Sequence, residues 1–397
     1  MFSYHAALEK VLACITPLPP VDIALDEAAG LVLAAPVAAR WDMPRTNNSA
    51  MDGFALPSTA CQGTLTLVGA AYAGHPFGGE VVAGSAVRIT TGAPLPAGCD
   101  AVVALEETEE TAAGVTLKTT PRPGDHVRYQ GEEYRGGETL LDAGTVLRAG
   151  EIGLLASAGA ARVKVHPRPR VAILSTGDEL VELGQEPGPG QIINSNLHHL
   201  AARVRECGGE VLRLGIGLDD PGGIDALVDA GRQADVLVST GGVSVGARDF
   251  VRDALDQRGF QQVFWKVAIK PGKPVLFGTL DGKPCFGLPG NPAATAATFE
   301  LFVRPTLRRL AGQPQVQAEM RQGVLVESVR GGGKRQSFLW CRLEWTGNSY
   351  LVQVARRQES GQTRSLQGAN ALLAVPIGVE KLGAGAVVEV QLLSSPT

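Results

Sequence analysis

The strongest constraint on the fold is a series of five short apolar runs between residues 169 and 312, separated by segments with helical periodicity. The runs are VAIL at 171, VLRLGI at 211, DVLVS at 235, VFWKVAI at 263 and CFGL at 285. Apolar runs that alternate with helices in this way are typical of a parallel sheet with helices packed on both faces. Residues 169–312 are therefore predicted to form an α/β domain around a doubly wound, mostly parallel sheet.

Two helices of this domain are predicted from residues that are typical of helix ends. The first begins after Asn194 or Ser195, either of which can cap it, and ends before Gly208. Its buried face consists of four apolar residues at helical spacing, namely Leu197, Leu200, Ala201 and Val204. The last helix follows LPGNP, where Asn291 can act as the cap and Pro292 fits the first turn because no hydrogen-bond donor is needed there.

The length of 397 residues is enough for two to four domains, since single domains usually hold about 100–200 residues. Before the α/β region, one helix is followed by short β runs that are broken by the turns GAPLPAG and PRPGD. We divide this part into a linking domain, residues 1–45 with 138–168, and a β-rich domain of residues 46–137. Short β segments between glycine turns predict a small β-barrel, or alternatively a sandwich, over residues 313–397.

The composition argues against several functional classes. The formal net charge is −4 and no run of Lys or Arg occurs, so the positive surface of a nucleic-acid-binding protein is missing. The six cysteines are scattered singly, without a CxxC pair, which argues against a zinc site and a disulfide framework. No signal peptide is recognisable, and no segment approaches the ~18 apolar residues of a membrane span. We expect a cytoplasmic protein without nucleic-acid or membrane partners.

The loops after the five apolar runs are the first places to look for a ligand, because open α/β sheets bind ligands outside the carboxyl ends of their strands. These loops are STGDE, GLDD, STGGVSVG, KPGKP and LPGNP. In STGGVSVG, three glycines allow backbone N–H groups to turn toward an anion, and the hydroxyls of Ser239, Thr240 and Ser244 can add donors. We predict a cradle for a phosphate or a pterin, although an ordinary glycine turn accounts for the same letters.

Three lysines, Lys266, Lys270 and Lys273, lie close together around the fourth loop. Lys266 and Lys270 are an even number of residues apart, so in one extended strand their side chains share a face and offer two cations to one anion. A solvated sheet edge is the alternative interpretation. The position of the lysines beside the other glycine-rich strand ends favours anion binding.

Five carboxylates lie at or close behind the same strand ends, namely Asp178, Glu179, Asp219, Asp220 and Asp249. Carboxylates beside a bound phosphate commonly hold Mg²⁺, although any single one of them can instead be a helix cap. The six histidines show no HxH or HExxH spacing, which argues against a histidine metal site and against Ser-His-Asp catalysis. In the N-terminal part, the motifs around Asp52 and Thr91 are either functional or simply turns.

Seven motifs occur in the order that is found in the molybdopterin molybdenumtransferase family: SAMDGFA, RITTGAPLPAGCDAVV, GEE, STGDEL, STGGVSVG, WKVAIKPGKP and GLPGNP. The chain resembles that family, which includes the E domain of gephyrin, over nearly its whole length. The resemblance implies an L-shaped, four-domain subunit in a homodimer, with a cleft between the central domain of one subunit and the β-rich region of the other. It also implies that adenylylated molybdopterin and molybdate are the substrates, that AMP is released, and that Mg²⁺ assists.

The family's functional residues are carried over onto ten positions of this sequence: Asp52, Thr91, Glu133, Glu179, Asp219, Asp249, Lys266, Lys270, Pro289 and Pro292. Among these, the resemblance implies that Lys266 and Lys270 bind molybdate or phosphate and that Asp219 and Asp249 bind Mg²⁺. Six further residues are assigned to substrate binding: Gly241, Gly242, Ser244, Gly246, Lys273 and Ser360. No covalent nucleophile is required, so catalysis is expected to consist of positioning and electrostatics.

The sequence departs from the family pattern at two positions. Glu133 stands where the family usually has Asp, which keeps the charge but moves the carboxylate by one methylene. Trp340, in SFLWCR, stands where the family has a basic residue that is thought to face molybdate. Either Arg335 or Arg342 compensates, or the chain is a specialised paralogue.

Two other functions are compatible with this architecture. One is a non-catalytic scaffold such as the gephyrin E domain, and the other is a dinucleotide pyrophosphatase-like hydrolase that shares only the central domain. The retained Asp and Lys residues argue against the scaffold, and the N-terminal motifs argue against the hydrolase. The molybdopterin adenylyltransferase is a candidate protein partner, and the preference for molybdate or tungstate stays open.

Overall fold

The computed structural model describes residues 1–59, 61–218, 221–242 and 250–394, and the chain forms two compact units. We call them the large unit, which comprises Met1–Val21, Gly30–Ala34 and Val165–Thr397, and the small unit, which comprises Asp22–Ala29 and Ala35–Lys164. The four domain boundaries expected from the sequence remain a prediction.

A six-stranded sheet forms the centre of the large unit, in the order β17-β14-β18-β22-β21-β19. Its strands are β14 (Arg170–Thr176), β17 (Glu210–Gly217), β18 (Val236–Thr240), β19 (Gln261–Trp265), β21 (Leu276–Leu280) and β22 (Lys283–Leu288). The first four strands in this order are parallel, and β21 is antiparallel to both of its neighbours. The predicted mostly parallel sheet is confirmed, and β21 is a strand that the five apolar runs did not include.

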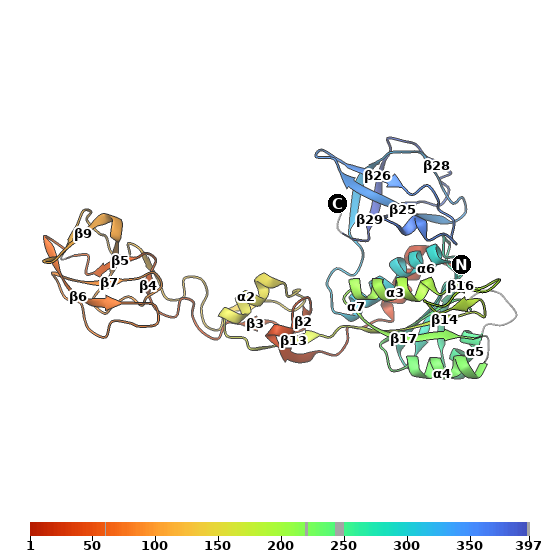
Figure 1. Cartoon of the computed structure of the whole chain (residues 1–397), viewed down its shortest axis with the longest axis horizontal. Helices are drawn as coiled ribbons and strands as arrows, with labels where there is room; N and C mark the ends of the chain where they lie inside the picture. The colour runs from red at the N-terminus through yellow and green to blue at the C-terminus, as the bar shows by residue number, and fades with distance from the viewer. Residues whose placement is uncertain (60, 219–220, 243–249, 395–397) are drawn as a thin grey trace. The chain divides into compact units, whose positions relative to one another are not determined.

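Helices cover both faces of this sheet (Figure 1). They are α1 (Tyr4–Ala13), α3 (Ser195–Glu206), α4 (Pro221–Gly231), α5 (Phe250–Gln257), α6 (Pro292–Thr298), the π-helical η3 (Phe299–Val303) and α7 (Arg304–Leu310). In β14, Val171 and Ile173 pack with α1, α3 and α7, while Ala172 and Leu174 pack with α4 and α5. Because both faces of the strand are buried, its sequence is a continuous apolar run and does not alternate with polar residues.

The apolar run at 263 does not form one strand. β19 ends at Trp265, and Lys266 has a φ of +77°, a backbone conformation that non-glycine residues rarely adopt. The chain then leaves the central sheet, and the short strand β20 (Ile269–Lys270) pairs in parallel with β25 of the C-terminal sheet. The expectation that Lys266 and Lys270 share the face of one strand is therefore wrong.

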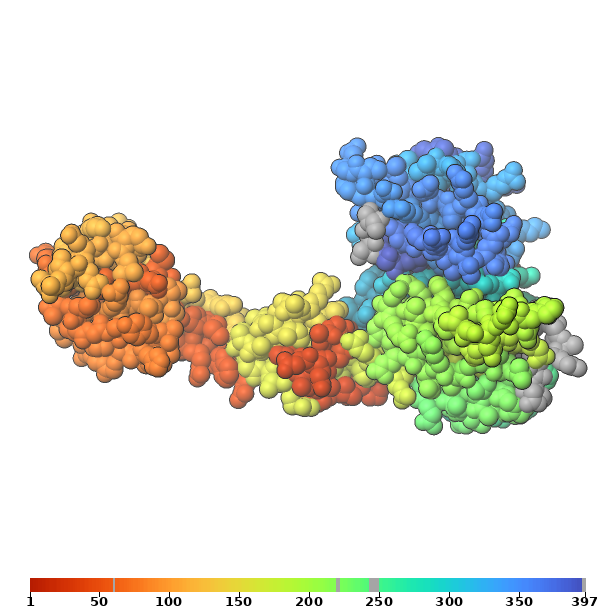
Figure 2. Space-filling model, in the orientation of Figure 1, coloured from red at the N-terminus to blue at the C-terminus, as the bar shows by residue number. Residues whose placement is uncertain are grey.

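The C-terminal part closes into a β-barrel. Its strands are β23 (Met320–Leu325), β25 (Gln336–Trp345), β26 (Tyr350–Val354), β27 (Ala371–Val375) and β29 (Val387–Leu392), with β20 added at β25. The order β25-β26-β23-β29-β27 is closed by pairing between β25 and β27. This closure confirms the barrel and rules out the sandwich, and the space-filling view shows the barrel residues as one rounded body (Figure 2).

The small unit is built mainly on a six-stranded sheet, in the order β8-β5-β7-β6-β10-β9. The strands are β5 (Gly53–Leu56), β6 (Thr64–Ala71), β7 (Ser85–Ile89), β8 (Ala101–Ala104), β9 (Thr108–Thr111) and β10 (Gly114–Leu117). The unit also contains α2 (Ala149–Ser157) and the strand pairs β3 (Val37–Ala38) with β12 (Thr139–Leu141) and β4 (Asn48–Ser49) with β11 (Val127–Arg128).

The remaining strands are short. β1 (Val21–Ala24), β13 (Arg162–His166) and β2 (Val32–Leu33) form a three-stranded sheet, β15 (Leu180–Val181) pairs with β16 (Ile192–Ile193), and β24 (Val329–Arg330) pairs with β28 (Lys381–Leu382). The 3-10 helices are η1 (Leu25–Glu27), η2 (Leu105–Glu107) and η4 (Arg364–Leu366).

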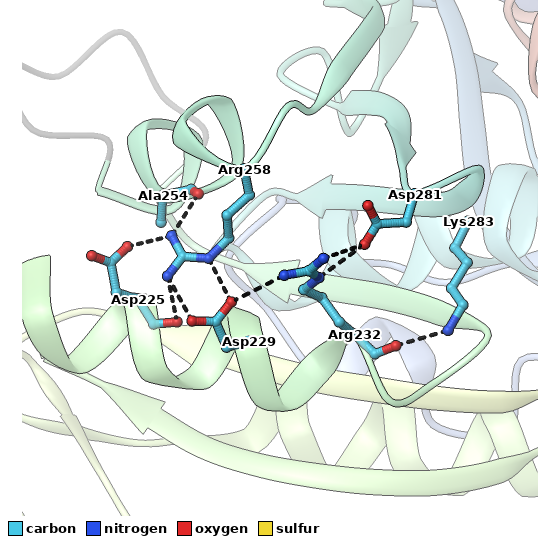
Figure 3. A network of polar contacts seen from close by, with 7 residues as sticks. All are labelled: Asp225, Asp229, Arg232, Ala254, Arg258, Asp281 and Lys283. Carbon is cyan, nitrogen blue, oxygen red and sulfur yellow. Dashed lines mark hydrogen bonds and ion pairs between the residues drawn. The ribbon is translucent and has the colours of Figure 1, made fainter.

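A network of charged groups joins α4 to α5 and to the turn between β21 and β22 (Figure 3). The Arg258 guanidinium donates hydrogen bonds of 2.7 Å to both Asp225 and Asp229 on α4. Arg232, which follows α4, donates to Asp281 in the turn at 2.9 Å. Most of these side chains are partly exposed, so solvent screens the pairs and each is expected to stabilise the fold only weakly.

A second cluster of charges is buried between the last helices and the end of the barrel. Glu300 in η3 is 2% exposed and accepts hydrogen bonds from Arg203 at 2.7 Å and Arg304 at 3.1 Å. Arg304 also donates to the backbone carbonyl of Leu392 at 2.9 Å. The cluster therefore ties the barrel strand β29 to the helices of the central sheet.

We predict that Glu300→Ala strongly destabilises the large unit. The substitution leaves two arginines without their buried partner, and losing one member of a buried ion pair typically costs about 3–5 kcal/mol. Glu206→Ala is the matched control, because Glu206 also binds Arg203 but its side chain is 59% exposed. Urea unfolding followed by circular dichroism measures both variants. Equal midpoints for the two variants would show that the buried cluster does not stabilise the fold.

Candidate active site

The carboxyl ends of β14, β18 and β22 meet at one edge of the central sheet, as their parallel pairing requires. A cavity of about 500 Å³ lies at this edge, and we call it the strand-end cavity. It is lined by residues that follow each of the three strands, including Glu179, Gly241, Gly242, Pro289 and Pro292. The structure therefore brings five of the predicted site residues together.

Gly241 is required at its position by close backbone packing. Its φ is +84°, and a Cβ atom there would lie 2.4 Å from the carbonyl oxygen of Thr176. The N–H of Gly241 is bound to the carbonyl of Leu288, and Gly242 also has a positive φ of +63°. The N–H of Gly241 is therefore used inside the protein and is not available to the predicted anion cradle. Ser244 and Gly246, the rest of the predicted cradle, lie outside the described residues.

The hydroxyls expected to donate to an anion bind inside the protein instead. Thr240 donates to Ser175 at 3.1 Å, and Ser175 donates to Asn194 at 3.0 Å. The Asn194 side chain also accepts from the N–H of Leu197, so it caps α3 as predicted. Ser239 has its hydroxyl directed at the carbonyl of Phe286. These bonds fix the floor of the cavity, whereas the hydroxyl of Thr176, which also lines the cavity, has no hydrogen-bond partner among the described residues.

A second cavity, of about 700 Å³, lies between the KPGKP segment and the barrel, and we call it the cation-lined cavity. Its lining includes five basic and two acidic side chains, namely Lys270, Lys273, Arg330, Arg335, Arg356, Glu327 and Glu359. It shares Pro274, Pro289 and Asn291 with the strand-end cavity, so the two cavities adjoin. An anion that reaches from the strand-end cavity into the cation-lined cavity would meet an excess of positive side chains.

Lys266 lines neither cavity as the structure describes them. Its Nζ lies 3.7 Å from the ring centroid of Trp265, in cation–π contact. Lys270 and Lys273 are therefore brought together, whereas Lys266 is held elsewhere by its neighbour. The left-handed backbone at Lys266 is the physical reason for this separation, because it ends the strand that the apolar run at 263 predicted.

Ser360 lies at the rim of the cation-lined cavity and is held by the start of α6. The side-chain amide of Asn291 donates to the Ser360 hydroxyl at 3.0 Å, and the N–H of Ala293 donates to its carbonyl at 2.9 Å. Asn291 occupies the cap position, but its side chain makes no capping hydrogen bond. Pro292 takes the first helical turn as predicted. The missing side-chain cap is explained by the bond to Ser360.

Trp340 is buried and lies outside the lining of both cavities. It packs against Ala296 and Ala297 of α6. Arg342 is exposed and pairs with Glu344, whereas Arg335 lines the cation-lined cavity. Of the two arginines considered as replacements for the family's basic residue, the structure therefore places only Arg335 at the cavity. Arg330 and Arg356 also reach it, and no motif in the sequence pointed to them.

In the small unit, Asp52 and Thr91 are directly bound. The backbone N–H and the hydroxyl of Thr91 donate to the same carboxylate oxygen of Asp52, at 2.6 and 2.9 Å. These two hydrogen bonds, the backbone bond first, lower the pKa of Asp52 and keep its carboxylate ionised. Glu133 belongs to the same unit and is exposed, and its N–H donates to the carbonyl of Met43.

No metal centre is formed by the residues that the structure describes, since no three His, Cys, Asp or Glu side chains are grouped for it. Asp219 and Asp249, the two predicted Mg²⁺ ligands, lie outside these residues. Within the described chain, no helix is long and apolar enough to cross a membrane.

We predict that Thr91→Val raises the pKa of Asp52 but leaves it below the ordinary value. The substitution removes the hydroxyl donor and keeps the backbone N–H, which is the larger cause of the lowering. A ¹³C NMR titration of the Asp carboxyl carbons measures the change. Because the folded-state pKa of Asp52 is lowered, its stabilising effect is present above the unfolded-state pKa and is lost as the pH falls through the folded-state pKa. Thr64→Val, an exposed threonine of β6, serves as the control and should leave Asp52 unchanged.

We predict that Gly241→Ala destabilises the large unit by about 2 kcal/mol or more, because it adds a clash with Thr176 to the cost of a positive φ. Gly184→Ala is the control, since Gly184 has a φ of +99° but no atom lies within 4 Å of the added Cβ. That variant should cost only about 1 kcal/mol. Thermal unfolding compares the two, and an equal loss in both variants would contradict the close packing at Gly241.

Three family models together match most of the chain. The MoeA N-terminal region (domain I and II) matches residues 2–159, the probable molybdopterin binding domain matches residues 172–309, and the MoeA C-terminal region (domain IV) matches residues 322–393. The two crystal structures of Pyrococcus horikoshii molybdopterin biosynthesis moeA protein give TM-scores of 0.85 and 0.81, at 29% and 27% identity. They cover 100% and 99% of this chain, and this chain covers 100% of each of them.

Two curated relatives show the similarity along the chain. A molybdopterin molybdenumtransferase from Nostoc sp. is 39% identical over 374 residues, which are 90% of this chain and 85% of the relative. Molybdopterin molybdenumtransferase 2 from Mycobacterium tuberculosis is 35% identical over 387 residues, 94% of each chain. This similarity extends through both units and includes the strand ends that form the two cavities. The chain belongs to the molybdopterin molybdenumtransferase, or MoeA, family.

Proposed function

We propose that this chain inserts molybdate into adenylylated molybdopterin and releases AMP, as the final metal-loading transferase of molybdenum cofactor biosynthesis. The observation that carries the proposal is the adjoining pair of cavities, one lined by a glycine turn and the other by an excess of cations. Both substrates are anions, and each cavity supplies a different kind of donor for one of them. The names of the family relatives support the same reaction.

The strand-end cavity is assigned to the phosphate and pterin parts of molybdopterin. Gly241 and Gly242 line this cavity, and Ser244 and Gly246 of the same motif are proposed as further substrate-binding residues. A rigid backbone cradle suits this role because it needs no reorganisation when charge develops on the phosphates. Pro289, Pro292 and Glu179 complete the wall.

The cation-lined cavity is assigned to molybdate. Lys270 and Lys273 offer two ammonium groups, Ser360 offers a hydroxyl, and Arg335 takes the place of the basic residue missing at Trp340. Such charged donors bind a tetrahedral dianion well, because charge-assisted hydrogen bonds are about twice as strong as neutral ones. Lys266 lies over Trp265, so we assign it to an outer position with no direct anion contact.

Mg²⁺ is assigned to the carboxylates of Asp219 and Asp249. This assignment rests on the preference of Mg²⁺ for oxygen ligands and on the positions of the two residues, one after β17 and the other before α5. A bound Mg²⁺ would supply charge neutralisation on the phosphates during release of AMP. The protein's own part is to hold the two anions side by side and to exclude competing geometries.

We further propose that the protein acts as a homodimer, in which Asp52, Thr91 and Glu133 complete the cleft of the partner. The Asp52 carboxylate is exposed and kept ionised by Thr91, so it is suited to bind or orient a group that arrives from outside its own unit. The molybdopterin adenylyltransferase, which would deliver the adenylylated substrate, is the proposed protein partner.

We predict that Lys270→Ala reduces molybdenum insertion at least about 30-fold, which corresponds to ~2 kcal/mol for a lost charge-assisted contact. The purified chain is incubated with adenylylated molybdopterin, Mg²⁺ and molybdate, and AMP and pterin-bound molybdenum are both measured. Lys334→Ala is the matched control, because Lys334 is exposed in the same unit and lies outside the cavity lining.

Three outcomes would contradict the proposal. Unchanged turnover of Lys270→Ala would refute the role of Lys270. Release of AMP by the wild-type chain without metal uptake would favour the pyrophosphatase-like hydrolase. If neither AMP nor metal-loaded pterin is formed, the non-catalytic scaffold is favoured.

A further inference from the structure

The turn after β26 forms one wall of the cation-lined cavity. β26 ends at Val354, and the N–H of Ala355 makes a hydrogen bond of 2.9 Å to the carbonyl of Trp340 in β25. The chain then leaves the barrel sheet and reaches Ser360 at the start of α6. Arg356 and Ser360, at the two ends of this turn, both line the cavity.

Gln358 attaches the middle of this turn to the sheet through three hydrogen bonds. Its side-chain carbonyl accepts from the N–H of Trp340 at 3.1 Å. Its side-chain NH₂ donates to the carbonyls of Trp340 and Ala355, each at 2.9 Å. A primary amide carries the same acceptor and donor as a peptide group, so Gln358 continues the ladder on β25 after β26 has ended.

The group to which Gln358 binds is itself fixed. The Trp340 side chain is 4% exposed and packs against the alanines of α6, and its backbone also pairs with Leu372 in β27. Because this part of β25 is held rigidly, its hydrogen bonds with Gln358 fix the position of the turn. The far end of the turn is fixed separately, by the bonds from Asn291 and Ala293 to Ser360.

The hydrogen bonds of Gln358 are not needed to close the barrel. Closure depends on the pairing of β25 with β27, and the core of the barrel consists of other side chains, such as Leu343, Val352 and Leu373. Gln358 lines the cation-lined cavity and lies outside that core. Loss of its side chain is therefore expected to release the turn while the barrel stays folded.

We infer that Gln358 is a positioning residue for anion binding, because it sets the turn that carries Arg356 and Ser360, which line the same cavity as Lys270 and Lys273. Arg356 has no ion-pair partner among the described residues, so its guanidinium is available to an anion. The inference rests on the proposed function, since molybdate is the anion to be bound. It adds one positioning residue and one cation to the binding site.

We predict that Gln358→Ala and Gln358→Met each raise the KM for molybdate about tenfold, the effect of losing roughly one well-placed polar contact. The KM for adenylylated molybdopterin should stay within about twofold of wild type, because Gln358 lines only the cation-lined cavity. Gln353→Ala is the matched control, an exposed glutamine of β26 outside that lining. Titration calorimetry with molybdate alone, on the full-length chain, should show the same tenfold loss in affinity.

Amide hydrogen exchange over residues 355–360 tests positioning without any ligand, and it should be faster in both Gln358 variants than in Gln353→Ala. Molybdate affinity equal to that of the control, or unchanged exchange, would overturn the inference. An equal rise in both KM values would overturn it too, because it would indicate general damage. If the wild-type chain binds no molybdate, the proposed function fails, and the exchange experiment alone decides whether Gln358 holds the turn.

Discussion

The close approach of three parallel strand ends is the constraint on which the site depends. β14, β18 and β22 are buried on both faces, so their polar groups can only gather where the strands end. At that edge the backbones of Gly241 and Thr176 are packed too closely for any side chain between them. The hydroxyls of Thr240 and Ser175 bind to one another and to the cap of α3, whereas the Thr176 hydroxyl in the cavity lining has no partner among the described residues.

The cation-lined cavity has a different origin, because it depends on the chain leaving the central sheet. At Lys266 the backbone turns away, and Lys270 is then placed by pairing of β20 with the barrel strand β25. The buried charges around Glu300 hold the barrel against the last helices of the same unit. The lining of the cavity therefore combines Lys270, placed by the pairing of β20, with side chains of the barrel itself.

The sequence predicted those parts of the fold that have a local signal. Apolar runs and the Asn194 cap each indicated an element that the structure contains, whereas the contact between Asp52 and Thr91 was not predicted. The break at Lys266 has no such signal, since the apolar run at 263 predicts one strand and the left-handed residue is not a glycine. Arg356 belongs to no motif, and its place at the cavity follows from barrel closure and the side-chain bonds of Gln358, which are long-range contacts.

The same contacts bear on the presence of a tryptophan at position 340. A basic residue there, as the resemblance leads one to expect, would bring charge to the site directly, whereas Trp340 is buried against the alanines of α6. An anion responds to the summed field of nearby cations, so charge lost at one position can be restored from others. Arg335 and Arg356 lie at the cavity, and the buried indole gives Gln358 a fixed backbone to hold. In the proposed binding site, position 340 contributes through rigidity, and the positive charge comes from Arg335 and Arg356, which lie on either side of it in the chain.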